Sequence, residues 1–346
     1  MFQSLRIKQF RGITDLSIDN LDHVNIITGK NNAGKTALLE ALFLHCSGVN
    51  PGLALVVNAM RGLERFGLEN SPGSEMPWDS VFPNYDRTCD VEISTKDKDG
   101  TSRITTLKVE RPKSALIESL SIRQVADVLV MESDDSTSAK KRVELTIEKN
   151  GPKIDPVLQT VLNATYVAAR RGSGPSEDAS RYGKLEIEKR EGILVEALKV
   201  IEPRLSRIAV IVTAGEGILY GDVGTGRLLP LPIMGEGMSR LATIILTLAV
   251  SRDGVVLIDE IENGFHYSVL EAVWRAIGKV ARQLYVQVFA TTHSHECVEA
   301  AHLAFKGSTP YDLRIHRIEH SDHISKVATY DQETIEAALN AKLEIR

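Results

Sequence analysis

The sequence has few cysteines and no long apolar run, and each absence excludes a class of protein. Its three cysteines, Cys46, Cys89 and Cys297, are far apart and odd in number. Neither a disulfide framework nor a paired-cysteine zinc site is therefore expected, which fits a reducing cytoplasm. No stretch of about 18 apolar residues occurs, and the apolar segment Leu241–Val250 is too short to span a membrane. The N-terminus indicates a strand and no signal peptide, so we expect a cytoplasmic protein without a membrane segment.

A net positive charge is also absent. The formal net charge of −5 argues against a globally basic nucleic-acid coat, although a local basic patch could still bind DNA. The chain has 346 residues, of which 43% are hydrophobic and 25% charged, as in an ordinary protein with a buried core. This length suits one large domain or two smaller ones.

Apolar patterning predicts alternating strands and helices at both ends of the chain. Right-handed crossovers and a mostly parallel sheet follow from that alternation. The expected strands are Phe2–Phe10, Asp15–Ile18, His23–Thr28, Cys89–Thr95, Ser102–Glu110, Val143–Ile147, Ile208–Thr213, Val255–Asp259 and Tyr285–Thr292. The expected helices are Thr36–Cys46, Leu53–Phe66, Ser114–Val130, Lys184–Ile201, Gly237–Ser251 and Tyr267–Arg282. Asp99-Gly100 predicts a hairpin turn, and the polar stretches 133–142 and 172–180 predict mobile loops.

The segment Gly29–Thr36 fits G-x-x-x-x-G-K-[ST], the pattern of a phosphate-binding loop, and lies between an apolar strand and an apolar helix. An ordinary glycine turn is the competing interpretation. Glycines let successive main-chain N–H groups face a phosphate, and the helix dipole adds to the attraction. Lys35 would reach the β- and γ-phosphates and the Thr36 hydroxyl would bind Mg²⁺. The other expected nucleotide contacts within this loop are Asn31, Asn32, Ala33 and Gly34.

Two acids, Asp259 and Glu260, directly follow the wholly apolar Val255–Ile258. Burying unpaired carboxylates is costly, so a cation or a water-filled site is their natural partner. We expect Asp259 to hold Mg²⁺, directly or through water. Glu260 would orient or deprotonate the attacking water as the catalytic base.

Two further segments are candidates for phosphate contacts. His293 follows the next buried strand and could donate to the γ-phosphate, although a satisfied histidine is the competing interpretation. Gly235 and Gly237 flank the start of an apolar helix, where main-chain N–H groups attract anions, or they form a simple loop into that helix. A metal site at His293, His295 and Glu296 is disfavoured, because spacing indicates no further ligand.

In order and content these motifs resemble the ABC-type ATPases, most closely the group of structural-maintenance-of-chromosomes (SMC) proteins, RecF and the OLD (overcoming lysogenization defect) ATPases. The resemblance rests on Phe10-Arg11-Gly12, Gly29–Thr36, Asp259–His266 and Thr292-His293-Ser294. It covers roughly residues 1–50 and 228–300. The middle is matched loosely, through Arg170, Arg171 and the segment Tyr182–Leu205.

The resemblance implies an ATPase head that dimerises, or forms a higher oligomer, around ATP and Mg²⁺. Gly235, Gly237 and Arg240 would then face the nucleotide of the partner copy, and Arg11 would lie near the chain's own nucleotide. Asn263 and His266 would lie in a loop at the dimer contact. Two departures stand out: the signature segment lacks its usual serine, and no glutamine stands in an obvious place to sense Mg²⁺, Gln124 and Gln159 being unsupported candidates.

The expected fold is α/β: an ABC-type P-loop head with a mixed central sheet, flanking helices, an antiparallel β region and a helical insertion. We expect one head with an N-terminal lobe (1–110), an insertion (111–206) and a C-terminal lobe (207–346). The chain after Glu260 has room only to finish the sheet, so the Toprim nuclease domain usual in OLD proteins is expected to be absent.

These features predict an ATP-hydrolysing OLD-like ATPase that controls a separate effector, such as a Toprim-type nuclease, in anti-phage defence or DNA maintenance. The alternative is a RecF-like clamp that binds DNA by itself through Lys140–Arg142, Arg170–Arg171 or Lys184–Arg190, which could equally be solvated surfaces. A transporter subunit is disfavoured by the long middle insertion. A scaffold that binds ATP without hydrolysing it is disfavoured by Glu260.

Overall fold

The computed structural model describes residues 1–63, 75–110, 127–148, 151–156, 164–169, 174–321, 324–341, 343 and 345. By contacts the chain divides into two compact units, each discontinuous in sequence. Unit 1 comprises Met1–Asn20, Thr36–Leu162 and Glu319–Val327, and unit 2 comprises Leu21–Lys35, Asn163–Ile318 and Ala328–Arg346.

Unit 1 is built on a seven-stranded antiparallel sheet in the order β2-β1-β4-β5-β6-β7-β8. Helix α1 is tied to this sheet by the fully buried His45, whose ring nitrogens bond the hydroxyls of Thr95 (2.8 Å) and Thr105 (2.9 Å). Its strands are β1 (Phe2–Phe10), β2 (Ile13–Ile18), β4 (Val91–Asp97), β5 (Ser102–Glu110), β6 (Val128–Asp135), β7 (Ser138–Glu148) and β8 (Gly151–Asp155), and its helices are α1 (Lys35–Cys46) and α2 (Leu53–Met60).

The second sheet has six strands in the order β16-β15-β3-β14-β13-β9, and all but the end of β15 and the first part of β16 belongs to unit 2. The pairs from β15 through β9 are parallel, and their Val, Ile and Phe residues are buried, as expected for strands covered on both faces. The strands are β3 (Val24–Gly29), β9 (Ala164–Val167), β13 (Val255–Ile258), β14 (Gln287–Thr291), β15 (Leu313–Ser321) and β16 (Ile324–Tyr330).

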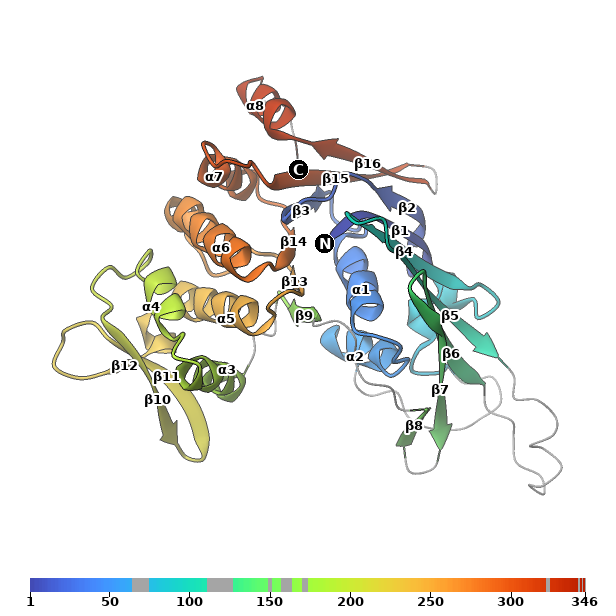
Figure 1. Ribbon diagram of the computed structural model, residues 1–346, viewed down its shortest axis with the longest axis horizontal. Coiled ribbons are helices and arrows are strands. Elements are labelled where there is room, and N and C mark those ends of the chain that lie inside the picture. Colours follow the sequence, from blue (N-terminus) through green and yellow to red (C-terminus); the bar gives the residue numbers. More distant parts are fainter. Residues whose placement is uncertain are drawn as a thin grey trace. The chain divides into compact units, whose positions relative to one another are not determined.

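Helices α5, α6 and α7 lie in a row beside the unit 2 sheet (Figure 1). A small antiparallel sheet of β10, β11 and β12 follows α3 and α4 in the chain. The bounds are α3 (Pro175–Ile187), α4 (Gly192–Leu198), β10 (Arg207–Thr213), β11 (Glu216–Asp222), β12 (Leu229–Pro230), α5 (Glu236–Val250), α6 (Leu270–Leu284), α7 (His295–Phe305) and α8 (Gln332–Asn340).

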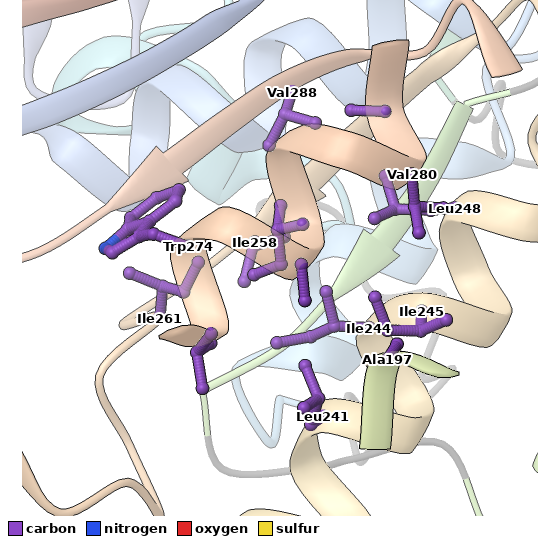
Figure 2. Close-up of a cluster of buried hydrophobic side chains, with 14 of the residues drawn as sticks. Ala197, Leu241, Ile244, Ile245, Leu248, Ile258, Ile261, Trp274, Val280 and Val288 are labelled. Carbon is purple, nitrogen blue, oxygen red and sulfur yellow. The ribbon is translucent and has the colours of Figure 1, made fainter. Parts of the chain in front are cut away.

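The core of unit 2 fixes α5 against the sheet. Apolar side chains of α5 converge there with side chains of β13, α6 and β14 (Figure 2). They are Leu241, Ile244, Ile245 and Leu248 of α5, Ile258 of β13, Trp274 and Val280 of α6, and Val288 of β14. All but Val280 are fully buried, and packing at this density resists small displacements. Because the strands are parallel, the carboxyl ends of β3, β13, β14 and β9 lie at the same edge of this sheet, which gathers the residues that follow them.

Several expectations for the middle of the chain were wrong. The polar stretch 133–142 is the end of β6, a turn and the start of β7, because exposed strands of an antiparallel sheet carry polar residues. The end of the expected helix Ser114–Val130 is β6, and residues 114–126 lie outside the described part. The expected helix Lys184–Ile201 begins earlier, at Pro175, and is broken after Ile187, where Lys189 has a left-handed φ of 57°. The expected mobile loop 172–180 is therefore helical from Pro175, and residues 172–173 lie outside the described part.

The remaining boundaries differ less. The expected helix Leu53–Phe66 ends at Met60, and residues 64–66 are outside the described part. The predicted hairpin turn is confirmed: β4 and β5 are joined through Asp99 and Gly100, whose φ of 90° suits glycine.

Candidate functional site

The phosphate loop begins where β3 ends, in unit 2. Gly29 has a φ of 138°, and a Cβ there would lie 2.5 Å from the carbonyl oxygen of Ile318, so only glycine fits. The loop turns again at Asn32 (φ 62°) and Gly34 (φ 95°), and the Ala33 N–H donates to Lys30 O at 3.2 Å. The exposed Asn31 lies within this turn. The left-handed residues give the loop the curvature that lets neighbouring N–H groups point to one anion.

The Lys35 ammonium folds back over this loop. Its Nζ donates to the carbonyl oxygens of Gly29 (2.7 Å) and Lys30 (3.0 Å). Burial lowers the pKa of Lys35, and the charges of Asp259, Glu260 and Glu262 oppose that shift. A partly desolvated cation held by two neutral acceptors can exchange them for phosphate oxygens, which would compensate its charge better.

The two predicted acids are held by one threonine of the neighbouring strand. The Thr291 hydroxyl, on β14, donates to Asp259 Oδ1 at 2.6 Å and accepts from the Glu260 N–H at 2.8 Å. Asp259 is 8% exposed, so this bond partly replaces its lost hydration. Glu260 has a φ of 46°, an uncommon value for a residue with a side chain, and the turn therefore stores some strain.

The carboxylate of Glu260 is oriented by Asn263. The Asn263 Nδ2 donates to Glu260 Oε2 at 2.8 Å and reaches the Ala169 carbonyl, just after β9, at 3.5 Å. Asn263 was expected only in a loop at a dimer contact, whereas in this structure its amide holds the candidate base. His266 is exposed and bonds Ser268.

His293 lies at the end of β14 with its ring about half exposed. Its main-chain N–H donates to Glu262 Oε1 at 3.1 Å, and its Nδ1 lies 3.4 Å from the same oxygen. Glu262, which had no predicted role, is only 13% exposed, and its Oε2 has no hydrogen-bond partner among the described residues. The signal was present in the third acid of Asp259–Glu262, two positions beyond Glu260.

Helix α5 begins after Gly235, whose φ is 126°, and no side chain caps this start. A Cβ on Gly237 would lie 2.9 Å from the Gly264 carbonyl oxygen, so the missing side chain lets α5 approach the turn after the acids. Arg240 was expected to face the nucleotide of a partner copy, but its side chain does not point outward. It is buried, and it donates to the carbonyl oxygens of Ala168 (2.7 Å) and Asp259 (2.9 Å).

Two predicted nucleotide contacts, Arg11 and Thr36, belong to unit 1. Arg11 pairs with the buried Glu40 (Nε–Oε2 2.8 Å) and donates to Asn58 Oδ1 at 3.0 Å. Glu40 also forms an ion pair with Arg61, whose Nε lies 2.6 Å from Glu40 Oε1. Arg11 therefore has a structural role within unit 1, and its nucleotide role stays a prediction, as does metal binding by Thr36.

Three observations bear on the remaining alternatives. Within the described ranges, no group of three or more His, Cys, Asp or Glu side chains is arranged to hold a metal ion. No helix in this part of the chain has the length and apolar character needed to cross a membrane. In the basic segment 140–142, Lys140 pairs with Glu132 and Arg142 with Glu110 and Glu144, each at 2.9 Å. Arg170, Arg171, Gln124 and Gln159 lie outside the described residues.

Two known proteins are similar to this chain in sequence. Over 335 residues, 86% of this chain and 87% of the relative, it is 22% identical to a Helicobacter pylori protein named ATP/GTP phosphatase. A shorter match, 46% identical over 61 residues, is to a Methanocaldococcus jannaschii protein, MJECL10, and covers 18% of this chain and 27% of that one.

Among solved structures, an SMC head bound to the C-terminal winged-helix domain of ScpA matches with a TM-score of 0.51 at 12% identity, covering 98% of this chain and 99% of that one. This likeness confirms the predicted α/β fold of an ATPase head. Residues 177–299 match a family model described as "AAA domain, putative AbiEii toxin, Type IV TA system". A second model, described as "AAA domain", matches residues 4–192, more than half of the chain. The chain therefore belongs to the AAA-domain family and has the fold of an SMC-type ATPase head.

Proposed function

We propose that this ATPase-type domain binds ATP with Mg²⁺ and hydrolyses it at the edge of the unit 2 sheet. The observation that carries the proposal is the Thr291 hydroxyl, which holds Asp259 and Glu260 together at the end of β13. Two carboxylates gathered at one buried strand end suit a hydrated cation and a water molecule.

We assign the predicted roles to the residues as follows. Lys35 would leave the carbonyls of Gly29 and Lys30 for phosphate oxygens, and Asp259 and Thr36 would hold the metal. Mg²⁺, when bound, neutralises charge on the phosphates. Glu260, oriented by Asn263, would accept a proton from the attacking water. His293, half exposed, would donate to the terminal phosphate.

The test is ATP turnover by purified Lys35→Ala and Glu260→Gln proteins. Both are expected to lose turnover, since one removes the phosphate contact and the other the base. The Glu260→Gln protein should still bind ATP. Glu271→Gln is the matched control, because Glu271 lies on the surface of α6, where it pairs with Arg275. Turnover in either site variant equal to that of the control would refute the assignment.

We further propose that two copies close around ATP and that the closed state acts on a separate effector, such as a Toprim-type nuclease, in an OLD-like defence or DNA-maintenance system. The matched family description that names a toxin and a TA system supports a defence setting. The SMC head of similar fold was solved bound to a separate protein, which makes an effector in trans a reasonable expectation. Gly235 and Gly237 would face the nucleotide of the second copy.

The effector is sought by a pull-down from the native host with Glu260→Gln, ATP and Mg²⁺, because this variant should hold the closed state. Recovery of a nuclease-like protein, lost with Lys35→Ala, supports the effector system. Recovery of the protein with DNA alone, in an ATP-dependent and salt-sensitive manner, favours the RecF-like clamp. The ion pairs of Lys140 and Arg142 with acids weigh against a basic DNA surface at that segment.

A further inference from the structure

Arg240 is a buried cation whose hydrogen bonds go to main-chain oxygens. It is 9% exposed, and its Nη1 and Nη2 donate to the carbonyls of Ala168 and Asp259. Burial lowers the pKa of this guanidinium, an effect that the nearby acids, led by Asp259 and Glu236, oppose. An apolar side chain of similar volume would fill this space without the cost of burying a charge. Packing alone therefore does not require an arginine here.

The bond to Asp259 fixes one peptide from both sides. The carbonyl oxygen of the Asp259–Glu260 peptide accepts from Arg240, and its N–H donates to the Thr291 hydroxyl. The two acidic side chains leave the Cα atoms on either side of this peptide. A rotation of the peptide would therefore turn both carboxylates, and the left-handed φ of Glu260 makes this turn one that needs such support.

Arg240 also belongs to the helix whose glycine start is expected to face the second nucleotide. Its neighbour Leu241 and Ile258, the residue before Asp259, are fully buried in one cluster, so α5 and β13 are firmly packed there (Figure 2). Beside them is a cavity of about 210 Å³ lined among others by Ser239, Arg240 and Asn263. The guanidinium thus joins α5 to the turn after β13 and borders space in which it can shift.

Building on the proposed ATPase function, we propose that Arg240 is a positioning residue that couples the start of α5 to the Asp259–Glu260 peptide. Engagement of Gly235 and Gly237 by the nucleotide of a second copy would move the first turns of α5, and Arg240 would pass this movement to the metal ligand and the base. A head without a partner would keep the acids in a less active arrangement.

The experiment compares Arg240→Met and Arg240→Lys with Arg282→Met, in full-length protein. Arg282 lies near the C-terminal end of α6 and pairs with Asp312. Its replacement removes a partly buried ion pair that includes none of the contacts of Arg240. The readouts are kcat and KM for ATP, binding of a fluorescent ATP analogue, the Mg²⁺ concentration for half-maximal binding of that analogue, and the thermal midpoint.

Arg240→Met should lower kcat by about 10–100-fold, the usual effect of removing a group that orients a metal ligand. Analogue binding without metal should stay within about twofold, while the half-maximal Mg²⁺ concentration rises. Arg240→Lys should recover part of kcat, because one ammonium can reach one of the two carbonyls. Arg282→Met should leave kcat and the Mg²⁺ requirement unchanged even if it lowers the thermal midpoint.

The coupling itself is tested by a double-mutant cycle with Gly235→Ala, whose added Cβ meets no atom within 4 Å but strains the φ of 126°. The two substitutions should reduce kcat by less than the product of their separate effects. Multiplicative effects, or an unchanged kcat and Mg²⁺ requirement in Arg240→Met, would overturn the proposal. If Arg240→Met does not fold, an unchanged kcat in Arg240→Lys overturns it equally. Failure of the wild-type protein to hydrolyse ATP would instead refute the proposed function.

Discussion

Replacing Thr291 with valine removes one hydroxyl and keeps the shape of the side chain. Thr291 is 1% exposed. Its hydroxyl donates a hydrogen bond to Asp259 Oδ1 at 2.6 Å and accepts one from the Glu260 N–H at 2.8 Å. The first has a charged acceptor, and bonds of that kind contribute about 1.5–3 kcal/mol. Because Asp259 keeps other interactions, we expect Thr291→Val to lower the free energy of unfolding by about 2 kcal/mol.

The same substitution should lower kcat for ATP by about 10–100-fold, since the Asp259 carboxylate loses the hydrogen bond that orients it and Glu260 loses the one that holds its main chain. Thr247→Val is the matched control: Thr247, on α5, is fully buried, and its hydroxyl has no hydrogen-bond partner in the described structure. Removing that hydroxyl should leave kcat unchanged and stability equal or higher. Urea unfolding and steady-state hydrolysis measure both effects. Equal stability and kcat for the two valine variants would refute the reasoning.

Two further predictions concern buried histidines and the phosphate loop. Burial lowers the pKa of His45 and His316 to about 3. The stability that each neutral ring contributes is therefore fully present above the ordinary histidine pKa and is lost as pH falls from about 6.5 towards 3. Lowering the pH from 7.5 to 5.5 should reduce the free energy of unfolding by about 1.4 kcal/mol for each histidine. Urea unfolding at both pH values checks this, and His45→Gln should show a loss smaller by that amount; an unchanged loss would contradict the His45 contribution. In the loop, Gly29→Ala should weaken ATP binding and lower the thermal midpoint, because its Cβ would lie 2.5 Å from Ile318 O. Gly183→Ala, in α3 with open space around it, is the control and should raise the midpoint slightly; equal midpoints would count against the steric argument.

The sequence predicted the candidate site best where a few neighbouring residues carry the functional groups. Gly29–Lys35 and Asp259–Glu260 each follow an apolar strand, so their position at a sheet edge could be predicted from local pattern alone. The structure places both in unit 2, with Lys35 influenced by the charge of both acids. Such motifs are local because a loop and a strand end each build their geometry from consecutive residues.

The middle of the chain could not be predicted in the same way. Lys140–Arg142 looks like a mobile polar loop in sequence, yet it belongs to β7, where its side chains pair with acids from β5 and β6. Strand pairing of this kind depends on partners far along the chain, which a local window does not contain. The left-handed Lys189, which lies between α3 and α4, was likewise not evident in a strongly helical pattern.

Similar reasoning explains why the roles of three site residues could not be predicted. No role was predicted for Thr291, and Asn263 and Arg240 were expected to have roles at a dimer contact. Thr291 and Arg240 act on the acids through bonds between separate elements, and Asn263 acts through a bond within the turn after β13. The acids identify the chemistry, but one peptide and two carboxylate oxygens are held by these neighbours. Since catalysis depends on orientation as much as on the reactive group, variants of these three residues should change turnover while the phosphate loop continues to bind nucleotide. A loss of binding in all three would show instead that the loop and the acids form one inseparable unit.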